Sequence, residues 1–180
     1  DLAQPFIRQT DFAGTNYFFY DLNAKMNYQF SQKDRIYLSG YFGRDVLTFA
    51  QPGRDFQFTL PYGNATATLR WNHLFTEKLF FNLSAIYNDY QFKAGFEQEE
   101  FNFDIFSGVR DFTAKFDFDY FPSNDHQVKT GIHATKHRLT PNIIRGSAGE
   151  TEFENTATAK YANEYAIYLQ DDWKINPWLR

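Results

Sequence analysis

Polar and apolar residues alternate along much of the chain, and residues 20–30 show the pattern without exception. The even positions carry Tyr20, Leu22, Ala24, Met26, Tyr28 and Phe30, and the odd positions carry Asp21, Asn23, Lys25, Asn27 and Gln29. A strand places the even set on one face, whereas a helix would scatter it around the circumference. Because about 11 residues are enough for a tilted strand to cross a bilayer core, this segment predicts a strand of transmembrane length.

The same alternation returns in further segments, which we predict as strands at 36–43, 65–76, 79–88, 101–121, 128–134 and 165–173. Its phase slips once near Ser107-Gly108, as at a β-bulge or at a break between loop and strand. Polar residues predict short turns at Gln32–Asp34, Thr76–Lys78, Ser123–Asp125 and Asn176-Pro177. The other connections, 44–64, 93–102 and 141–158, lose the period and predict long loops, two of them with prolines.

Short turns at one end and long loops at the other are typical of barrels that span the outer membrane. We therefore predict an all-β fold, an antiparallel up-and-down transmembrane β-barrel, of which this chain supplies about seven to eight strands of a larger barrel. Both ends of the chain look cut. A soluble ligand-binding barrel shares the alternation, but its outward face would be polar.

Composition narrows the classes of function. With 22 Phe, 12 Tyr and 3 Trp, the chain is rich in residues that favour strands. It contains no cysteine, which excludes disulfides and thiolate metal sites, and its net charge of -4 argues against a nucleic-acid partner. The chain contains no run of about 18 apolar residues, so no membrane-spanning helix is predicted. A negative mean hydropathy still fits a barrel, because the apolar and polar faces average out.

The apolar phase of the strands predicts which side chains face lipid. These are Leu22, Met26, Leu38, Leu69, Trp71, Phe81, Leu83, Phe116, Ile167 and Leu169. Aromatic residues near the short turns predict an interfacial girdle. They are Tyr28, Phe30, Phe75, Tyr120, Trp173 and Trp178.

Three clusters of titratable residues are candidate chemical sites. His133 and His137 share one face of a strand but lie roughly 13 Å apart at the usual rise, too far to share a metal. Glu97, Glu99 and Glu100 lack the Asp/Asn spacing of a calcium loop. Asp117 and Asp119, beside Lys115, resemble a carboxylate pair, but a wet barrel wall would not raise the pKa of an acid. We predict no enzyme activity, no cofactor and no metal.

The segment Tyr168-Leu169-Gln170-Asp171-Asp172-Trp173 resembles the Tyr-x-Gln-Asp-x-Trp ends of strands in TonB-dependent receptors. Residues 37–45 (YLSGYFGRD) and 67–75 (ATLRWNHLF) resemble the Bacteroidota branch of that family. The resemblance implies a location in the bacterial outer membrane, in a 22-stranded barrel filled by an N-terminal plug. On that comparison residues 1–180 are part of the barrel domain, roughly a third of its wall, with neither the plug domain nor a TonB box.

The function predicted from this resemblance is import of a nutrient across the outer membrane. The implied partners are outer-membrane lipid, the rest of the barrel and its plug, the TonB complex through that plug, and a nutrient of unknown identity. The alternative is a small eight-stranded structural or adhesive outer-membrane barrel that binds a partner through its extracellular loops. With the short turns on the periplasmic side, the predicted loops face outward and supply candidate ligand contacts. These are Arg44, Arg54, Phe56, Phe58, Tyr62, Glu97, Glu99 and Glu100.

Overall fold

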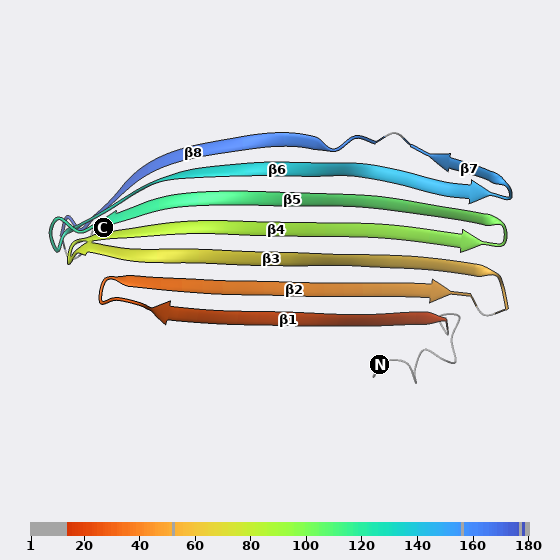
Figure 1. Ribbon diagram of the computed structural model, residues 1–180, viewed down its shortest axis with the longest axis horizontal. Helices are drawn as coiled ribbons and strands as arrows, with labels where there is room; N and C mark the ends of the chain where they lie inside the picture. Colours follow the sequence, from red (N-terminus) through yellow and green to blue (C-terminus); the bar gives the residue numbers. More distant parts are fainter. Residues whose placement is uncertain (1–13, 52, 156, 177, 179–180) are drawn as a thin grey trace.

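One antiparallel sheet accounts for almost all of the computed structural model, which describes residues 14–51, 53–155, 157–176 and 178 (Figure 1). The strands are β1 (Thr15–Gln29), β2 (Asp34–Ala50), β3 (Phe56–Thr76), β4 (Leu79–Gln98), β5 (Phe101–Tyr120), β6 (His126–Ala148), β7 (Thr151–Glu154) and β8 (Lys160–Trp173). No helix in the described part of the chain is long and apolar enough to cross a membrane.

Each strand from β1 to β6 pairs with the next one along the chain, so the topology is up-and-down. β7 pairs with the far end of β6, at 145–148, and β8 pairs with residues 126–139 of the same strand. They therefore continue one another along one edge. The predicted fold class, all-β with an antiparallel up-and-down sheet, is confirmed. Within the described residues the sheet is open, because β1 pairs only with β2 and β8 only with β6.

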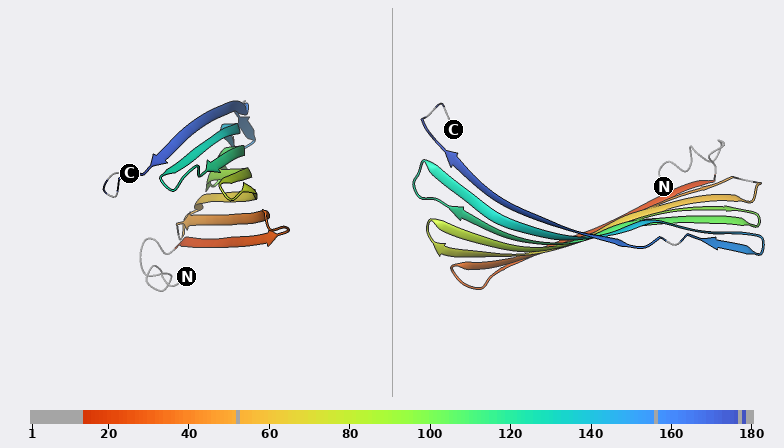
Figure 2. Two further views of the ribbon diagram at one scale, coloured as in Figure 1. Left: turned by 90° about the vertical axis from the view of Figure 1, so that its left-hand side faces the viewer. Right: turned by 90° about the horizontal axis from the view of Figure 1, so that it is seen from above.

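The sheet is a single, strongly twisted layer (Figure 2). No apolar side chain of the described residues is buried, and Leu22 and Ile167 are 66% and 78% exposed. Soluble proteins rarely expose large contiguous apolar surfaces. The fold therefore needs something outside the described residues to cover its apolar face.

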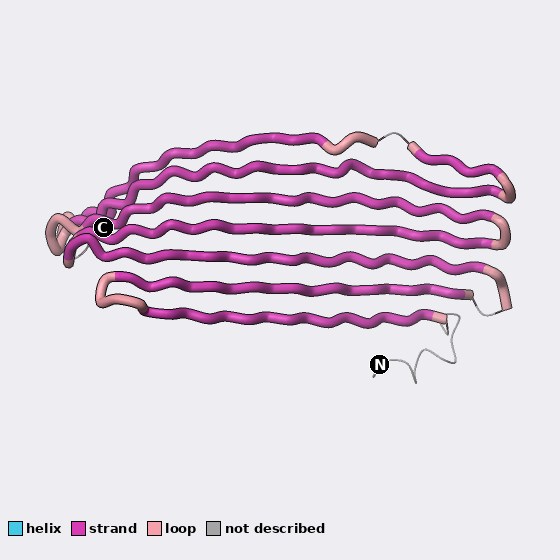
Figure 3. Tube along the Cα trace, in the orientation of Figure 1, coloured by secondary structure: helices cyan, strands magenta, loops and turns pink. Residues whose placement is uncertain are grey.

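The connections are short at both ends of the sheet, so the three predicted long loops are wrong (Figure 3). Of the described residues in the segment 44–64, only 51 and 53–55 lie outside strands, and of 93–102 only Glu99 and Glu100 do. In 141–158, β6 runs on to Ala148 and β7 follows after two residues. The turns at the two ends therefore differ little in length. We keep the name short turns for the connections 30–33, 77–78 and 121–125, which lie at one end of the sheet.

Strand length explains why the sequence suggested loops. A strand of about 20 residues spans about 65 Å, whereas about 11 residues cross the bilayer core. Beyond the core neither face has to be apolar, so alternation no longer marks the strand. Prolines also suggested loops where the structure has strands. Pro61 lies in β3 where its pairing with β4 skips two residues, between Thr59↔Gly95 and Tyr62↔Phe92. A residue without an N–H is tolerated at such a gap.

A bulge does lie opposite Ser107, but it belongs to β6 and not to the segment 101–121, in which it was predicted. The pairing of β5 with β6 jumps from Phe106↔Ile143 to Gly108↔Thr140, with Pro141 inside the gap on β6. Two residues of β6 there oppose one of β5. The pairing of β5 with β4 continues in step through the same region, so the extra residue belongs to β6.

Candidate functional site

The two faces of the sheet differ in chemistry, and all ten residues predicted to face lipid share one face. The cross-strand register joins Met26, Leu38 and Leu69 in one row and continues Trp71 through Leu83 to Phe116 in the next. We call this side the belt face and the other side the polar face. Contact with lipid itself stays a prediction, but the faces are as the alternation indicated.

At the end opposite the short turns, the border between apolar and polar residues on the belt face runs obliquely across the strands. In one cross-strand row the change from apolar to polar falls between Ala65 of β3 and Asp89 of β4. In the next row toward the short turns it falls two strands later, between Phe112 of β5 and Lys136 of β6. The limit thus shifts by about one residue per strand. A flat apolar layer would then cross strands tilted by about 35°, as in barrels.

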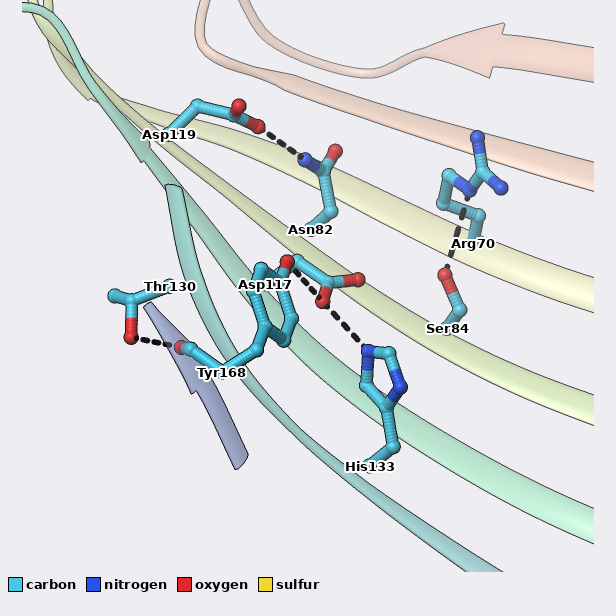
Figure 4. Close-up of polar contacts among 8 residues, drawn as sticks. All are labelled: Arg70, Asn82, Ser84, Asp117, Asp119, Thr130, His133 and Tyr168. Atoms are coloured by element: carbon cyan, nitrogen blue, oxygen red, sulfur yellow. Dashed lines mark hydrogen bonds and ion pairs between the residues drawn. The ribbon is translucent and has the colours of Figure 1, made fainter. Parts of the chain in front are cut away.

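On the polar face, hydrogen bonds between side chains link different strands (Figure 4). Asp117 of β5 accepts a hydrogen bond from the Tyr168 hydroxyl at 2.9 Å and lies 3.0 Å from Nε2 of His133. Asn82 donates to Asp119 at 3.4 Å, and Arg70 Nε donates to Ser84 at 3.3 Å. Four further pairs make such contacts: Tyr41 with Asp21, Thr66 with Asn88, Thr113 with Thr135, and His137 with Asp111.

These contacts account for the titratable clusters singled out from the sequence. His133 and His137 have separate carboxylate partners, Asp117 and Asp111, on the neighbouring strand. Asp119 lies 3.9 Å from Lys129. No three His or acidic residues of the described segments are grouped so that they could hold a metal ion. The arrangement ties strands together in a partly exposed wall.

Gly131 creates the space in which Tyr168 reaches Asp117. The three residues form one cross-strand row on β8, β6 and β5, and the tyrosine passes over the glycine. An added Cβ at Gly131 would lie 2.5 Å from the Asp117 carboxylate, 2.6 Å from the Tyr168 ring and 2.8 Å from the backbone oxygen of Phe116. Aromatic side chains that cover glycines fix strand register. Gly131 is therefore a packing position, despite lying in the middle of a strand.

We expect Gly131→Ala to destabilise the protein by about 1–3 kcal/mol, because the Cβ must displace the Tyr168 ring and strain the backbone. The measurement is the urea midpoint of the protein folded in lipid vesicles. Gly40→Ala is the matched control, since an added Cβ there meets only the Thr66 oxygen, at 3.8 Å. Equal midpoints for the two variants would contradict this role of Gly131.

Toward the end of the sheet opposite the short turns, the polar face becomes aromatic. One cross-strand row carries Phe49, Phe58, Phe96 and Phe103 on four successive strands. Phe56 makes edge-to-face contacts with Phe49 and Phe96, with ring centroids 5.9 and 5.3 Å apart, and Phe96 contacts Phe101 at 5.9 Å. We call Phe49, Phe56, Phe58, Phe96, Phe101 and Phe103 the aromatic patch. The available signal was the spacing of Phe56 with Phe58 and of Phe101 with Phe103.

The predicted ligand-contact residues are divided by the structure. Phe56, Phe58 and Tyr62 share the polar face of β3, where the first two belong to the aromatic patch. Arg44 and Glu97 lie on the belt face instead. The remaining three residues, Arg54, Glu99 and Glu100, are exposed in the short connections. Whether any of the eight contacts a ligand stays a prediction.

The sequence matches no family model and no curated protein. One solved structure that the sheet resembles is the ferric yersiniabactin uptake receptor FyuA from Yersinia pestis. The TM-score is 0.63 over 91% of this chain, with 9% sequence identity, and the chain spans 27% of the length of that receptor. The likeness is one of fold: the sheet has the fold of a stretch of β-barrel wall.

Proposed function

We propose that this chain forms part of the wall of an outer-membrane β-barrel that imports a nutrient. The observation that carries the proposal is a single-layer sheet with an exposed apolar belt on one face and a hydrogen-bonded polar network on the other. Lipid would cover the belt face and a water-filled lumen would solvate the polar face. Closure of the barrel by further strands would satisfy the backbone groups at the open edges.

Two features favour a wide barrel over a small eight-stranded one. The edges at β1 and β8 remain apart among the described residues. The polar face also carries long charged side chains and an aromatic patch, which would crowd the interior of a small barrel. The adhesive eight-stranded barrel remains the second candidate. It would bind its partner through long extracellular loops, whereas the connections between the described strands are short.

The finer assignment is a TonB-dependent receptor of the Bacteroidota type, with a plug and the TonB complex as partners. It is supported by the resemblance of residues 168–173 to strand ends of that family and by the likeness in fold to a protein described as an uptake receptor. The aromatic patch supports import as well, because rings on the lumen side offer contact area to an entering ligand.

Orientation is testable, because the chain has no cysteine and a single one can be introduced. We expect Glu77→Cys, in the turn between β3 and β4, to stay unmodified when intact cells are treated with a membrane-impermeant maleimide. Arg54→Cys, in the connection between β2 and β3, should be labelled; both parent side chains are exposed. Labelling at 77 but not at 54 would invert the orientation.

Import itself is tested by deleting the gene for the intact protein and growing the strain on limiting ferric complexes, cobalamin or oligosaccharides. We expect a growth defect on at least one of these nutrients, which a high nutrient concentration removes and the intact gene restores. A strain that grows normally on all of them but adheres less to surfaces would favour the adhesive barrel.

A further inference from the structure

A cluster of cations lies on the belt face, directly beyond the apolar residues at the end opposite the short turns. On β5 the apolar run ends at Phe112 and Arg110 follows on the same face; on β6 it ends at Ala134, and Lys136 and Arg138 follow. Arg110 and Arg138 are paired directly opposite one another in the register of the sheet. Like charges in that position repel each other and destabilise a sheet.

The protein neutralises only part of this charge. Arg110 donates from Nε and Nη2 to one oxygen of Asp89, at 2.9 and 2.6 Å. The Lys136 ammonium lies 5.9 Å from the centre of the Tyr161 ring, and Arg138 is exposed and has no ion pair or hydrogen bond with any described residue. Three cations thus share one carboxylate. We call Arg110, Lys136 and Arg138 the basic cluster.

The other border of the apolar belt has a different character. The belt-face side chains next to the short turns include Asp34, which lies 2.6 Å from His73, and Asp171, which lies 2.8 Å from His126. Among the belt-face strand residues of the described segments, carboxylates with histidine partners lie at this border, whereas the basic cluster lies at the other. A surface of this kind is complementary to anionic groups held at one border of a membrane.

We propose that the basic cluster binds the phosphate groups of an anionic glycolipid in the outer leaflet. This inference rests on the proposed function, which puts the belt face in lipid and the short turns in the periplasm. The position next to the last apolar residues is the level of a lipid headgroup. Guanidinium groups bind phosphate with two parallel hydrogen bonds, and a phosphate between Arg110 and Arg138 would remove their repulsion.

The test compares binding of two lipids by the intact barrel protein in detergent micelles, measured by native mass spectrometry. The lipids are bisphosphorylated lipid A and the same lipid without phosphates. We expect the protein to bind the phosphorylated lipid about 25-fold more tightly, since Lys136 and Arg138 have no carboxylate partner and each basic residue at a membrane surface contributes about fivefold. The double variant Arg138→Gln with Lys136→Gln, which leaves the Arg110 to Asp89 pair intact, should lose most of that preference.

The matched control is Lys25→Gln with Lys115→Gln, which removes the same charge from the polar face and should keep the preference. Heat-modifiable migration on gels verifies that every variant folds. The proposal is overturned if the two double variants behave alike or if millimolar inorganic phosphate displaces the lipid, which would indicate a site for the free anion. Failure of the proposed function is a separate result, seen as normal growth of the deletion strain on all the limiting nutrients or as a protein that stays monomeric without detergent.

Discussion

Leu83→Arg should destabilise the folded barrel in a bilayer by about 2–4 kcal/mol, the cost of a cation on the lipid face near the membrane midplane. Leu83 lies in the middle of the apolar run of β4, with Leu79 and Phe81 on one side and Ala85 and Tyr87 on the other. Its row continues across the sheet into Trp71 and Phe116, so a guanidinium there has only apolar side chains beside it. With the belt face in lipid, as proposed, this position would be too deep for the side chain to reach water easily.

Asn82→Arg is the control, because it adds the same group to the neighbouring residue but on the polar face. Its cross-strand partner on β5 is Asp117, and the Asn82 side chain already reaches Asp119. We expect little loss of stability for this variant. The measurement is the free energy of unfolding in lipid vesicles, from urea titrations of tryptophan fluorescence. If the two arginine variants unfold at the same urea concentration, the belt face does not contact lipid.

The alternation was sufficient to predict which residues share a face. Leu22, Leu69 and Ile167 are far apart in sequence, yet the register places them on the same side of the sheet. This succeeded because the side-chain period of a strand is two, so that within each regular run parity decides the face. The change of phase near Ser107 has another cause than a bulge in β5: that strand stays in step with β4, and its apolar residues move from the polar face at Phe103 to the belt face at Phe112.

The extent of the strands could not be predicted, because alternation exists only where the two faces meet different surroundings. Two apolar residues are adjacent in each of two paired strands: Val46 and Leu47 in β2, and Leu60 and Pro61 in β3. Neither stretch has an apolar and a polar phase. Pairing there depends on backbone hydrogen bonds and on neighbours that are distant in sequence. The same holds for Gly131, whose packing against Tyr168 and Asp117 depends on the register of three strands.

The aromatic patch was missed as a unit for this reason. Assigning 44–64 and 93–102 to loops left Phe56 and Phe58 as isolated contacts and gave Phe96 no role. Once these segments are strands, alternate phenylalanines share the polar face in neighbouring strands, and their rings contact one another edge to face. Such rings present area with few torsions to immobilise on binding.

Phe96→Ser should therefore weaken uptake of the imported nutrient, with about thirtyfold more of it needed for half-maximal growth. Phe96 contacts both Phe56 and Phe101, so its removal opens the centre of the patch. A central aromatic contact is typically worth about 2 kcal/mol of binding. The nutrient is the one on which the deletion strain fails to grow. A substitution is preferable to deleting residues 51–60, because Phe56–Leu60 pair with β2 and their loss would break the sheet.

The control is Phe106→Ser, which removes the same ring from the belt face of β5, where the Lys93 ammonium lies 5.7 Å from its centre. Both variants lose a half-buried phenylalanine beyond the apolar belt, so their effects on folding should be similar, about 1–2 kcal/mol. Only Phe96→Ser should change the nutrient requirement at equal amounts of folded protein. If Phe106→Ser raises the requirement as much, or Phe96→Ser leaves it unchanged, the aromatic patch does not contact the nutrient.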